Sequence, residues 1–225
     1  MVRTAVLLFV IVTVTGLPAV AQQSAFGFGL KGGLNLGDVE LKHELEGDAQ
    51  ESYRYGLAAG AVLSLFVNPA LSLDTDILYM QKGHTWEYEY REGSDPGGTR
   101  GWSYTSKTDY VVVAPMLRIT FRGRNLSPYL IAGPEFGFLL DARMERQDKD
   151  DGEVRDTSEE DTQDAFADTD WGVAFGGGFE FPTGGAAVFL EGRYSLGMAD
   201  INEGGSDNGG SQKNRGIYLL GGLRF

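Results

Sequence analysis

The chain has 225 residues and carries 19 Lys and Arg against 32 Asp and Glu, a formal net charge of −13. A field of this sign repels phosphate backbones, so we do not expect a nucleic-acid partner. The absence of cysteine excludes a disulfide framework and a thiolate metal site, and two histidines leave little for a histidine relay. A hydrophobic content of 42% excludes disorder over most of the chain.

The first 21 residues have the pattern of a secretory signal peptide. Arg3 supplies the positive end, residues 5–14 form an apolar core, and Ala19-Val20-Ala21 forms a small-residue cleavage site before Gln22. The alternative is a membrane-anchoring helix, but Thr, Gly and Pro interrupt the apolar run before it could span about 30 Å. We predict cleavage after Ala21, leaving one domain, residues 22–225, that acts outside the cytoplasm.

The rest of the chain alternates apolar and polar residues with the period of a β-strand. This pattern predicts eight strands, at 25–37, 53–67, 70–86, 104–122, 127–142, 169–181, 186–199 and 214–225. Each has at least the roughly 9–11 residues that a strand needs to cross a bilayer. No later segment has the 18 consecutive apolar residues of a membrane-spanning helix.

The connections alternate between short turns and long polar loops. Short turns are predicted at 68–69, 122–125 and 182–185, and long loops at 38–52, 87–103, 143–168 and 200–213. Short turns at one end and long loops at the other are typical of outer-membrane barrels. The predicted fold is therefore all-β: an eight-stranded antiparallel up-and-down transmembrane β-barrel, closed because an open edge in hydrocarbon leaves costly unpaired backbone groups.

Each strand has an apolar face and a charged face. On strand 186–199, for example, Leu190 and Leu196 oppose Glu191 and Arg193. Alternation alone fits a soluble barrel with an apolar cavity as well as a membrane barrel with a polar lumen. Glycines favour the second arrangement, because a narrow lumen needs small residues beside its large ones. The glycines on the charged face are Gly27, Gly29, Gly33, Gly60, Gly172, Gly176, Gly178 and Gly222.

Five cations and five anions fall on the predicted lumen face. They are Lys31, Lys82, Arg118, Arg193 and Arg224 against Asp74, Asp76, Glu135, Glu180 and Glu191. Charges held together in a narrow space must pair. We predict a salt-bridged plug centred on the three arginines with Asp76, Glu135 and Glu191. The alternative is a gated or ion-selective pore.

Loop 143–168 is strongly acidic and contains a segment similar to a calcium loop. Its possible ligands are Asp148, Asp150, Asp151 and Glu153, with Glu159 in a closing position. The glycine comes one residue too early for that motif, so a solvated acidic loop is the simpler interpretation. We expect no resident metal and no cofactor. Divalent cations at the acidic loops, bridging to anionic outer-leaflet lipid, are a further potential partner.

Aromatic residues gather towards both ends of the predicted strands, as in the interfacial girdles of membrane barrels. Trp86, Tyr88, Tyr90, Trp102, Tyr104, Tyr110 and Trp171 lie near the long loops, and Phe66, Phe121, Tyr129, Phe181, Phe189 and Phe225 near the short turns. A carbohydrate-stacking platform at Trp86 and Trp102 is the alternative for the first group.

A lipid-modifying enzyme would need a nucleophile, a base and an orienting acid. His84 has Ser103, Ser106 and Glu87 in its neighbourhood, but the chain lacks the His-Ser signatures of lipid A deacylases. A single loosely placed histidine is more often a surface residue. We therefore expect a protein that is not an enzyme.

Several segments resemble the outer-membrane β-barrel domain family, the porin-family or PorT-like proteins of Gram-negative bacteria. These are residues 71–83 (LSLDTDILYMQKG), 129–137 (YLIAGPEFG), 29–35 (GLKGGLN) and 221–225 (GGLRF). The resemblance implies an outer-membrane barrel of a Gram-negative bacterium in contact with outer-membrane lipid, and is nearly silent on activity. Phe225, with Leu223 and Leu219, resembles the signal read by the barrel assembly machinery; an ordinary lipid-facing phenylalanine is the alternative.

Together these features predict a non-enzymatic integral outer-membrane barrel with a filled lumen, in an envelope-structural or surface-contact role. A small channel for ions or solutes and a component of a secretion machine, which the PorT resemblance suggests, are alternatives. A lipid-modifying enzyme is a third.

Overall fold

The computed structural model describes residues 25–41, 50–91, 99–150, 153–163, 166–201 and 212–225, so the predicted signal peptide lies outside the described residues. Its strands are β1 (Phe26–Leu41), β2 (Gln50–Asn68), β3 (Leu71–Arg91), β4 (Thr99–Thr120), β5 (Ser127–Asp150), β6 (Glu153–Asp161), β7 (Thr169–Pro182), β8 (Ala187–Gly197) and β9 (Gln212–Arg224). No helix in these ranges is long and apolar enough to cross a membrane.

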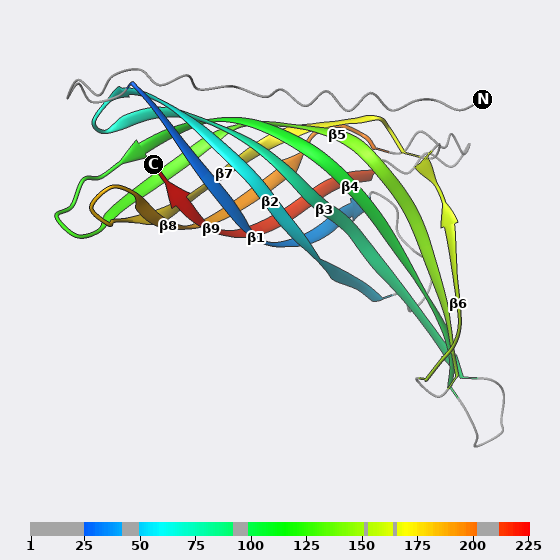
Figure 1. Ribbon diagram of the computed structural model, residues 1–225. Helices are drawn as coiled ribbons and strands as arrows, with labels where there is room; N and C mark the ends of the chain where they lie inside the picture. The colour runs from blue at the N-terminus through cyan, green and yellow to red at the C-terminus, as the bar shows by residue number, and fades with distance from the viewer. Residues whose placement is uncertain (1–24, 42–49, 92–98, 151–152, 164–165, 202–211) are drawn as a thin grey trace.

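Eight of the strands form a closed antiparallel ring in the order β1-β2-β3-β4-β5-β7-β8-β9 (Figure 1). Closure comes from β1, which pairs with β2 on one side, Leu34 opposite Leu57, and with β9 on the other, Leu34 opposite Leu219. The C-terminal residue meets the start of β1 there, where Phe225 N–H donates to Phe28 O at 2.7 Å. The eight-stranded barrel predicted from the sequence is confirmed.

The turns at the end that holds the start of β1 and the C-terminus are short, as predicted. Asn68 Oδ1 accepts a hydrogen bond from Ala70 N–H at 2.8 Å in the β2–β3 turn. Thr183 N–H donates to Ala186 O at 2.8 Å in the β7–β8 turn, where Gly184 takes a left-handed φ of 76°. These local hydrogen bonds let adjacent strands reverse direction without leaving backbone groups unsatisfied.

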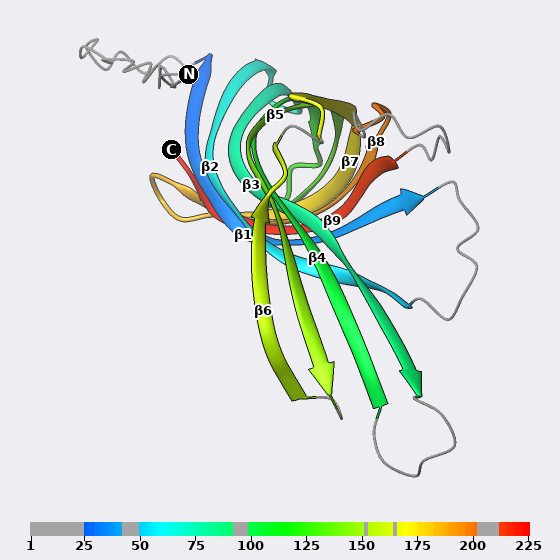
Figure 2. The same cartoon turned by 90° about the vertical axis from the view of Figure 1, so that its right-hand side faces the viewer.

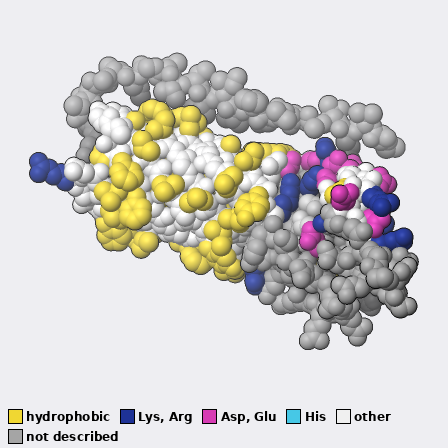
Figure 3. Space-filling view, turned by 90° about the horizontal axis from the view of Figure 1, so that it is seen from below, with side chains coloured by type: hydrophobic (Ala, Val, Ile, Leu, Met, Phe, Trp, Pro, Cys, Tyr) yellow, Lys and Arg dark blue, Asp and Glu magenta, His cyan; other side chains and the backbone are white. Residues whose placement is uncertain are grey.

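The barrel is apolar outside and polar inside. Leu190, Phe136 and Ile217 expose 51%, 42% and 50% of their surface, whereas Asp76 and Arg118 expose 0% and 1%. Figure 3 shows hydrophobic side chains spread over the barrel wall, and most of the charged ones gathered towards the right-hand end of the view. A wall of this kind is stable only against hydrocarbon, which removes from water the apolar side chains that the barrel leaves uncovered.

Two lumen glycines make room for aromatic rings. A Cβ on Gly222 would lie 2.5 Å from the ring of Phe189, and one on Gly178 would lie 2.6 Å from the ring of Tyr129. Both rings are buried inside the barrel. The small residues therefore let large ones fill a narrow lumen.

The structure corrects two of the predicted loops. Most of 87–103 and 143–168 is strand: β3 continues to Arg91, β4 begins at Thr99, β5 continues to Asp150, and β6 follows as a ninth strand outside the ring. We call β3 84–91, β4 99–107, β5 143–150 and β6 the projecting sheet; Figure 2 shows it leaving the barrel. Sequence patterning missed it most clearly in the last part of β5 and in β6, which carry almost no apolar residues and so show no apolar alternation.

The predicted aromatic girdles are also partly wrong. Trp171, Phe121, Phe181 and Phe225 do face outward. Tyr110, Tyr129 and Phe189, in contrast, are at most 2% exposed and fill the lumen. Trp86, Tyr88, Trp102 and Tyr104 share the strand face of Tyr110, because side chains two residues apart point the same way. They continue the inner wall onto the projecting sheet, and the side chain of Tyr90 lies outside the described residues.

Candidate functional site

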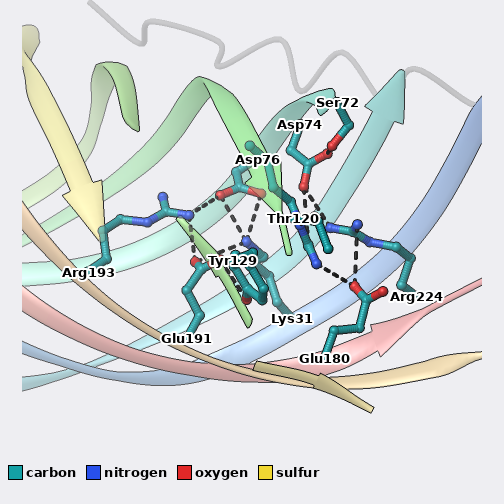
Figure 4. A network of polar contacts seen from close by, with 11 residues as sticks. Lys31, Ser72, Asp74, Asp76, Thr120, Tyr129, Glu180, Glu191, Arg193 and Arg224 are labelled. Atoms are coloured by element: carbon teal, nitrogen blue, oxygen red, sulfur yellow. Dashed lines mark hydrogen bonds and ion pairs between the residues drawn. The ribbon is translucent and has the colours of Figure 1, made fainter. Parts of the chain in front are cut away.

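The charged lumen side chains form three clusters along the barrel axis. The central cluster joins Lys31 and Arg193 to Asp76 and Glu191 (Figure 4). Lys31 Nζ lies 3.0 Å from Asp76 and 3.3 Å from Glu191, and Arg193 Nη2 lies 2.6 Å and 2.7 Å from the same two carboxylates. All four side chains are at most 4% exposed. Two cations therefore neutralise two anions away from water.

The turn-end cluster lies nearer the short turns and consists of Arg118, Arg224, Asp74 and Glu180. Arg224 Nη2 contacts Asp74 at 2.6 Å, and Arg118 Nη2 contacts Glu180 at 2.5 Å. Crossed contacts of 3.6 Å and 3.5 Å complete a square of alternating charges. Glu180 is the most accessible member, with 20% of its side chain exposed, because it lies closest to the barrel mouth.

Tyr129 links these two clusters. Its hydroxyl donates a hydrogen bond to Glu191 Oε2 at 3.1 Å, and its ring lies 3.6 Å beneath the Arg118 guanidinium. A cation over an aromatic face is stabilised by the ring quadrupole, more so when water is excluded. The Tyr129 side chain thus fills the space between the clusters, with its hydroxyl bound to the central cluster and its ring packed on the turn-end cluster.

The loop-end cluster is different because one cation serves two acids. Lys82 Nζ lies 3.3 Å from Glu135 and 3.2 Å from Asp170, and all three side chains are at most 7% exposed. Neutral donors add to it: the Tyr218 hydroxyl donates to Glu135 at 3.1 Å and the Asn214 amide donates to Asp170 at 2.9 Å. Hydrogen bonds therefore compensate for the missing second cation.

The structure brings all ten predicted lumen residues into these clusters, with partners that differ in part from the prediction. Arg118 and Arg224 pair with Asp74 and Glu180, while Glu135 pairs with Lys82. Sequence reasoning missed Asp170. The signal was present: Trp171 faces outward, so the preceding residue on a strand must face inward.

Four of the five candidate calcium ligands are among the described residues, and these four do not converge. Asp148 pairs with Arg146 at 3.0 Å, and Asp150 pairs with Arg155 at 2.7 Å. Glu153 lies opposite Asp150 at the start of β6, Glu159 lies further along that strand, and Asp151 is outside the described residues. Within the described ranges, no group of three or more acidic or histidine side chains is placed to hold a metal ion.

His84 lies directly opposite Ser106 on β3 and β4, while Ser103 lies opposite Glu87. His84 and Ser106 are both buried, and neither the ring nitrogens nor the Ser106 hydroxyl has a hydrogen-bond partner. The imidazole packs edge-on against Trp86, with ring centroids 3.9 Å apart. The two residues are thus neighbours without the hydrogen bond that activates a nucleophile.

Phe225, Leu223 and Leu219 lie on the lipid-facing side of β9, exposed by 61%, 42% and 51%. Their recognition by the assembly machinery stays a prediction.

On the projecting sheet, the ion pairs are more accessible to water than those in the lumen. Lys107 pairs with Glu145, and Lys149 Nζ contacts Glu87 at 2.9 Å. The hydrogen bond from Lys107 lowers the pKa of the Glu145 carboxyl, since it favours the charged form. These pairs join β3, β4 and β5 across the sheet.

The family model for outer membrane protein beta-barrel domains matches residues 20–203. The chain belongs to this family. It is accordingly a protein of the Gram-negative outer membrane, and its apolar wall faces lipid. A search of curated protein sequences finds no match.

Solved barrels are similar at low identity. Neisserial surface protein A has 13% identity and a TM-score of 0.44, covering 89% of this chain and 96% of its own. OprG from Pseudomonas aeruginosa has 14% identity and a TM-score of 0.41, and the outer membrane protease OmpT from Escherichia coli has 12% identity and a TM-score of 0.39. For both, the match covers 89% of this chain and 96% of the other. A fold does not fix a function, so the role of this chain is argued from its own residues.

Proposed function

We propose that this barrel is a non-enzymatic envelope protein whose lumen is closed by ion pairs and whose projecting sheet makes contacts outside the cell. The observation that carries the proposal is the stack of three buried charge clusters, which crosses the lumen from β1 to β8 and from β3 to β7. An open pore would instead hold its charged side chains in water.

The closed state is favoured by the energetics of the clusters. Separating Arg193 from Asp76, 2.6 Å apart and both at most 1% exposed, would leave two charges without solvent or partner. Breaking such a pair by removing one member costs about 3–5 kcal/mol. Thermal opening of a path through three such clusters is therefore rare, and an eight-stranded lumen has little space beside its side chains.

Planar-bilayer conductance of the purified barrel tests this proposal. We expect no stable openings for the wild-type protein. The double variant Lys31→Ala/Arg193→Ala removes the cations of the central cluster and is expected to show ion leakage. Arg143→Ala, which changes an exposed cation, is the matched control and should remain closed. Stable wild-type channels would contradict the filled lumen.

The absence of enzymatic activity is part of the proposal and rests on His84. His84 lies opposite Ser106, and both side chains are buried without the hydrogen bond between them that would activate the serine hydroxyl. We expect His84→Ala to leave the lipid A profile of the host membrane unchanged. A changed profile, with the barrel folded normally, would favour a lipid-modifying enzyme.

A further inference from the structure

Along β6, the projecting sheet ends in an acidic edge with which no other strand of the described residues pairs. We propose that this edge binds a cationic peptide segment in an extended conformation, which adds to β6 as a further strand. The inference rests on the surface-contact role proposed above and names the chemistry of the partner.

The first observation is the edge itself. β6 pairs with β5 on one side, and no strand of the described residues pairs with its other side. All nine of its residues are exposed. A sheet edge of this length presents backbone donors and acceptors to which another chain can pair.

The direction of the backbone groups can be assigned. Thr162 N–H donates to Ala142 O at 3.0 Å, so the residue that follows β6 faces β5. Because these groups alternate along a strand, Ser158 and Glu160 also face β5, and Thr157, Glu159 and Asp161 face away. The Thr157 N–H accordingly turns to the Asp156 side chain at 2.9 Å. Glu159 and Asp161 present the open edge.

The second observation is charge. The sequence of β6, EVRDTSEED, contains five carboxylates and one guanidinium, a net charge of −4. The single cation, Arg155, is already 2.7 Å from Asp150. Carboxylates occur on both faces of the strand, Glu160 on one and Glu159 on the other. A second copy of this edge would be repelled, whereas lysines or arginines of an added strand would find partners on either face.

The third observation is that the projecting sheet already binds a guanidinium beside a carboxylate and an aromatic ring. Arg146, on the neighbouring β5, lies 5.6 Å from the centre of the Tyr104 ring and 3.0 Å from Asp148. Beside it, the rings of Tyr88 and Trp102 stack with centroids 5.9 Å apart. Aromatic faces beside carboxylates favour cations. β6 itself holds carboxylates and no aromatic ring, so a partner's basic side chains that reach over it meet the carboxylate part of this arrangement.

Binding of synthetic peptides to the full chain in lipid nanodiscs tests the proposal. The probe is a fluorescent nine-residue peptide of alternating lysine and threonine. Two comparisons are made: a peptide with glutamate in place of lysine, and the lysine peptide with all its backbone amides methylated, so that neither of its edges can donate. We expect the lysine peptide to bind, the glutamate peptide not to bind, and methylation to weaken binding about tenfold, since it removes backbone hydrogen bonds.

Two variants at one position separate backbone pairing from charge. Glu159→Pro removes an outward N–H and one charge, and Glu159→Ala removes the charge alone. Proline is tolerated on an edge strand when its missing N–H faces solvent, and hydrogen exchange of Ser158 and Glu160 verifies that β6 stays paired with β5. We expect the proline variant to bind the lysine peptide several-fold more weakly than the alanine variant.

Equal binding of the methylated and unmethylated peptides would overturn the proposal, because attraction would then be electrostatic only. Self-association of the barrel through β6, or no peptide binding at all, would also overturn it. Conductance is measured on the same nanodisc-derived protein. A closed barrel that binds no peptide removes this inference alone, and an open barrel that binds peptide contradicts only the closed lumen.

Discussion

The lumen and the projecting sheet both contain pairs of arginine with an acidic residue, but the pairs are buried in the lumen and exposed on the sheet. In the central cluster, the charges of Arg193 and Glu191 are at most 3% exposed and stand 2.7 Å apart. On the projecting sheet, Arg146 and Asp148 are 3.0 Å apart with almost half of each side chain exposed. The distances are similar, but water screens the second pair and not the first. Burial rather than pairing therefore decides how much an ion pair matters here.

The largest effect is expected from Arg193→Met. The change leaves Asp76 and Glu191 with Lys31 alone inside the barrel, and an uncompensated buried charge costs about 3–5 kcal/mol. Urea unfolding in lipid vesicles measures this cost. Arg143→Met, on an exposed pair, should cost less than about 1 kcal/mol. Similar losses for the two variants would contradict the comparison.

Filling the lumen is expected to have the next largest effect. Gly222→Val places carbon 2.5 Å from the Phe189 ring and close to the backbone of β1, so we expect a loss of about 1–3 kcal/mol from overpacking. Gly192→Val is the matched control, because a Cβ at Gly192 meets nothing within 4 Å. Thermal unfolding, read from the mobility of the folded barrel on gels, compares them. A control as unstable as the lumen variant would point to strand propensity instead.

The loop-end cluster should tolerate the loss of a charge better than the central one. Asp170→Asn leaves Lys82 paired with Glu135, whereas Asp76→Asn removes an acid that two cations share. We expect the first to cost about 1 kcal/mol and the second clearly more. Urea unfolding of both variants measures the two losses of stability. A larger loss for Asp170→Asn than for Asp76→Asn would show that the two acids of the loop-end cluster do not compete for one lysine.

The smallest effect is a pH dependence confined to the projecting sheet. Since Lys107 lowers the pKa of Glu145, the stabilisation is present above the carboxyl's usual pKa of about 4.3 and is lost as the pH falls through its lowered value. The hydrogen-exchange protection factors of the paired β4 and β5 segments, which correct for the slower intrinsic exchange in acid, should therefore fall in this acid range in the wild type. Glu145→Gln should already show lower protection factors at neutral pH, and these should change little on acidification. Identical dependence of hydrogen exchange on pH in the wild type and in Glu145→Gln would show that the Lys107–Glu145 pair does not stabilise the sheet.

Much of the barrel could be predicted from the sequence, because a wall between hydrocarbon and a narrow lumen requires strict alternation. Leu190 and Phe136 on one side, and Glu191 and Glu135 on the other, follow from counting by two. The same counting indicates ten lumen charges. The same counting also places Asp170 inward, since Trp171 beside it faces outward.

The tertiary structure decided what alternation cannot express. Residues 143–150 and 153–161 read as a polar loop, yet the first segment pairs with β4 and the second with β5, and this pairing makes them strands, since backbone hydrogen bonds form whatever the side chains are. Which charges pair depends on strand order around the ring, so Arg118 meets Glu180 from β7 rather than Glu135 from its neighbour β5. The sequence by itself determined which side chains face inward, because that depends on the local period of the strand. Their partners, and the open edge of β6, were decided only when distant strands came together.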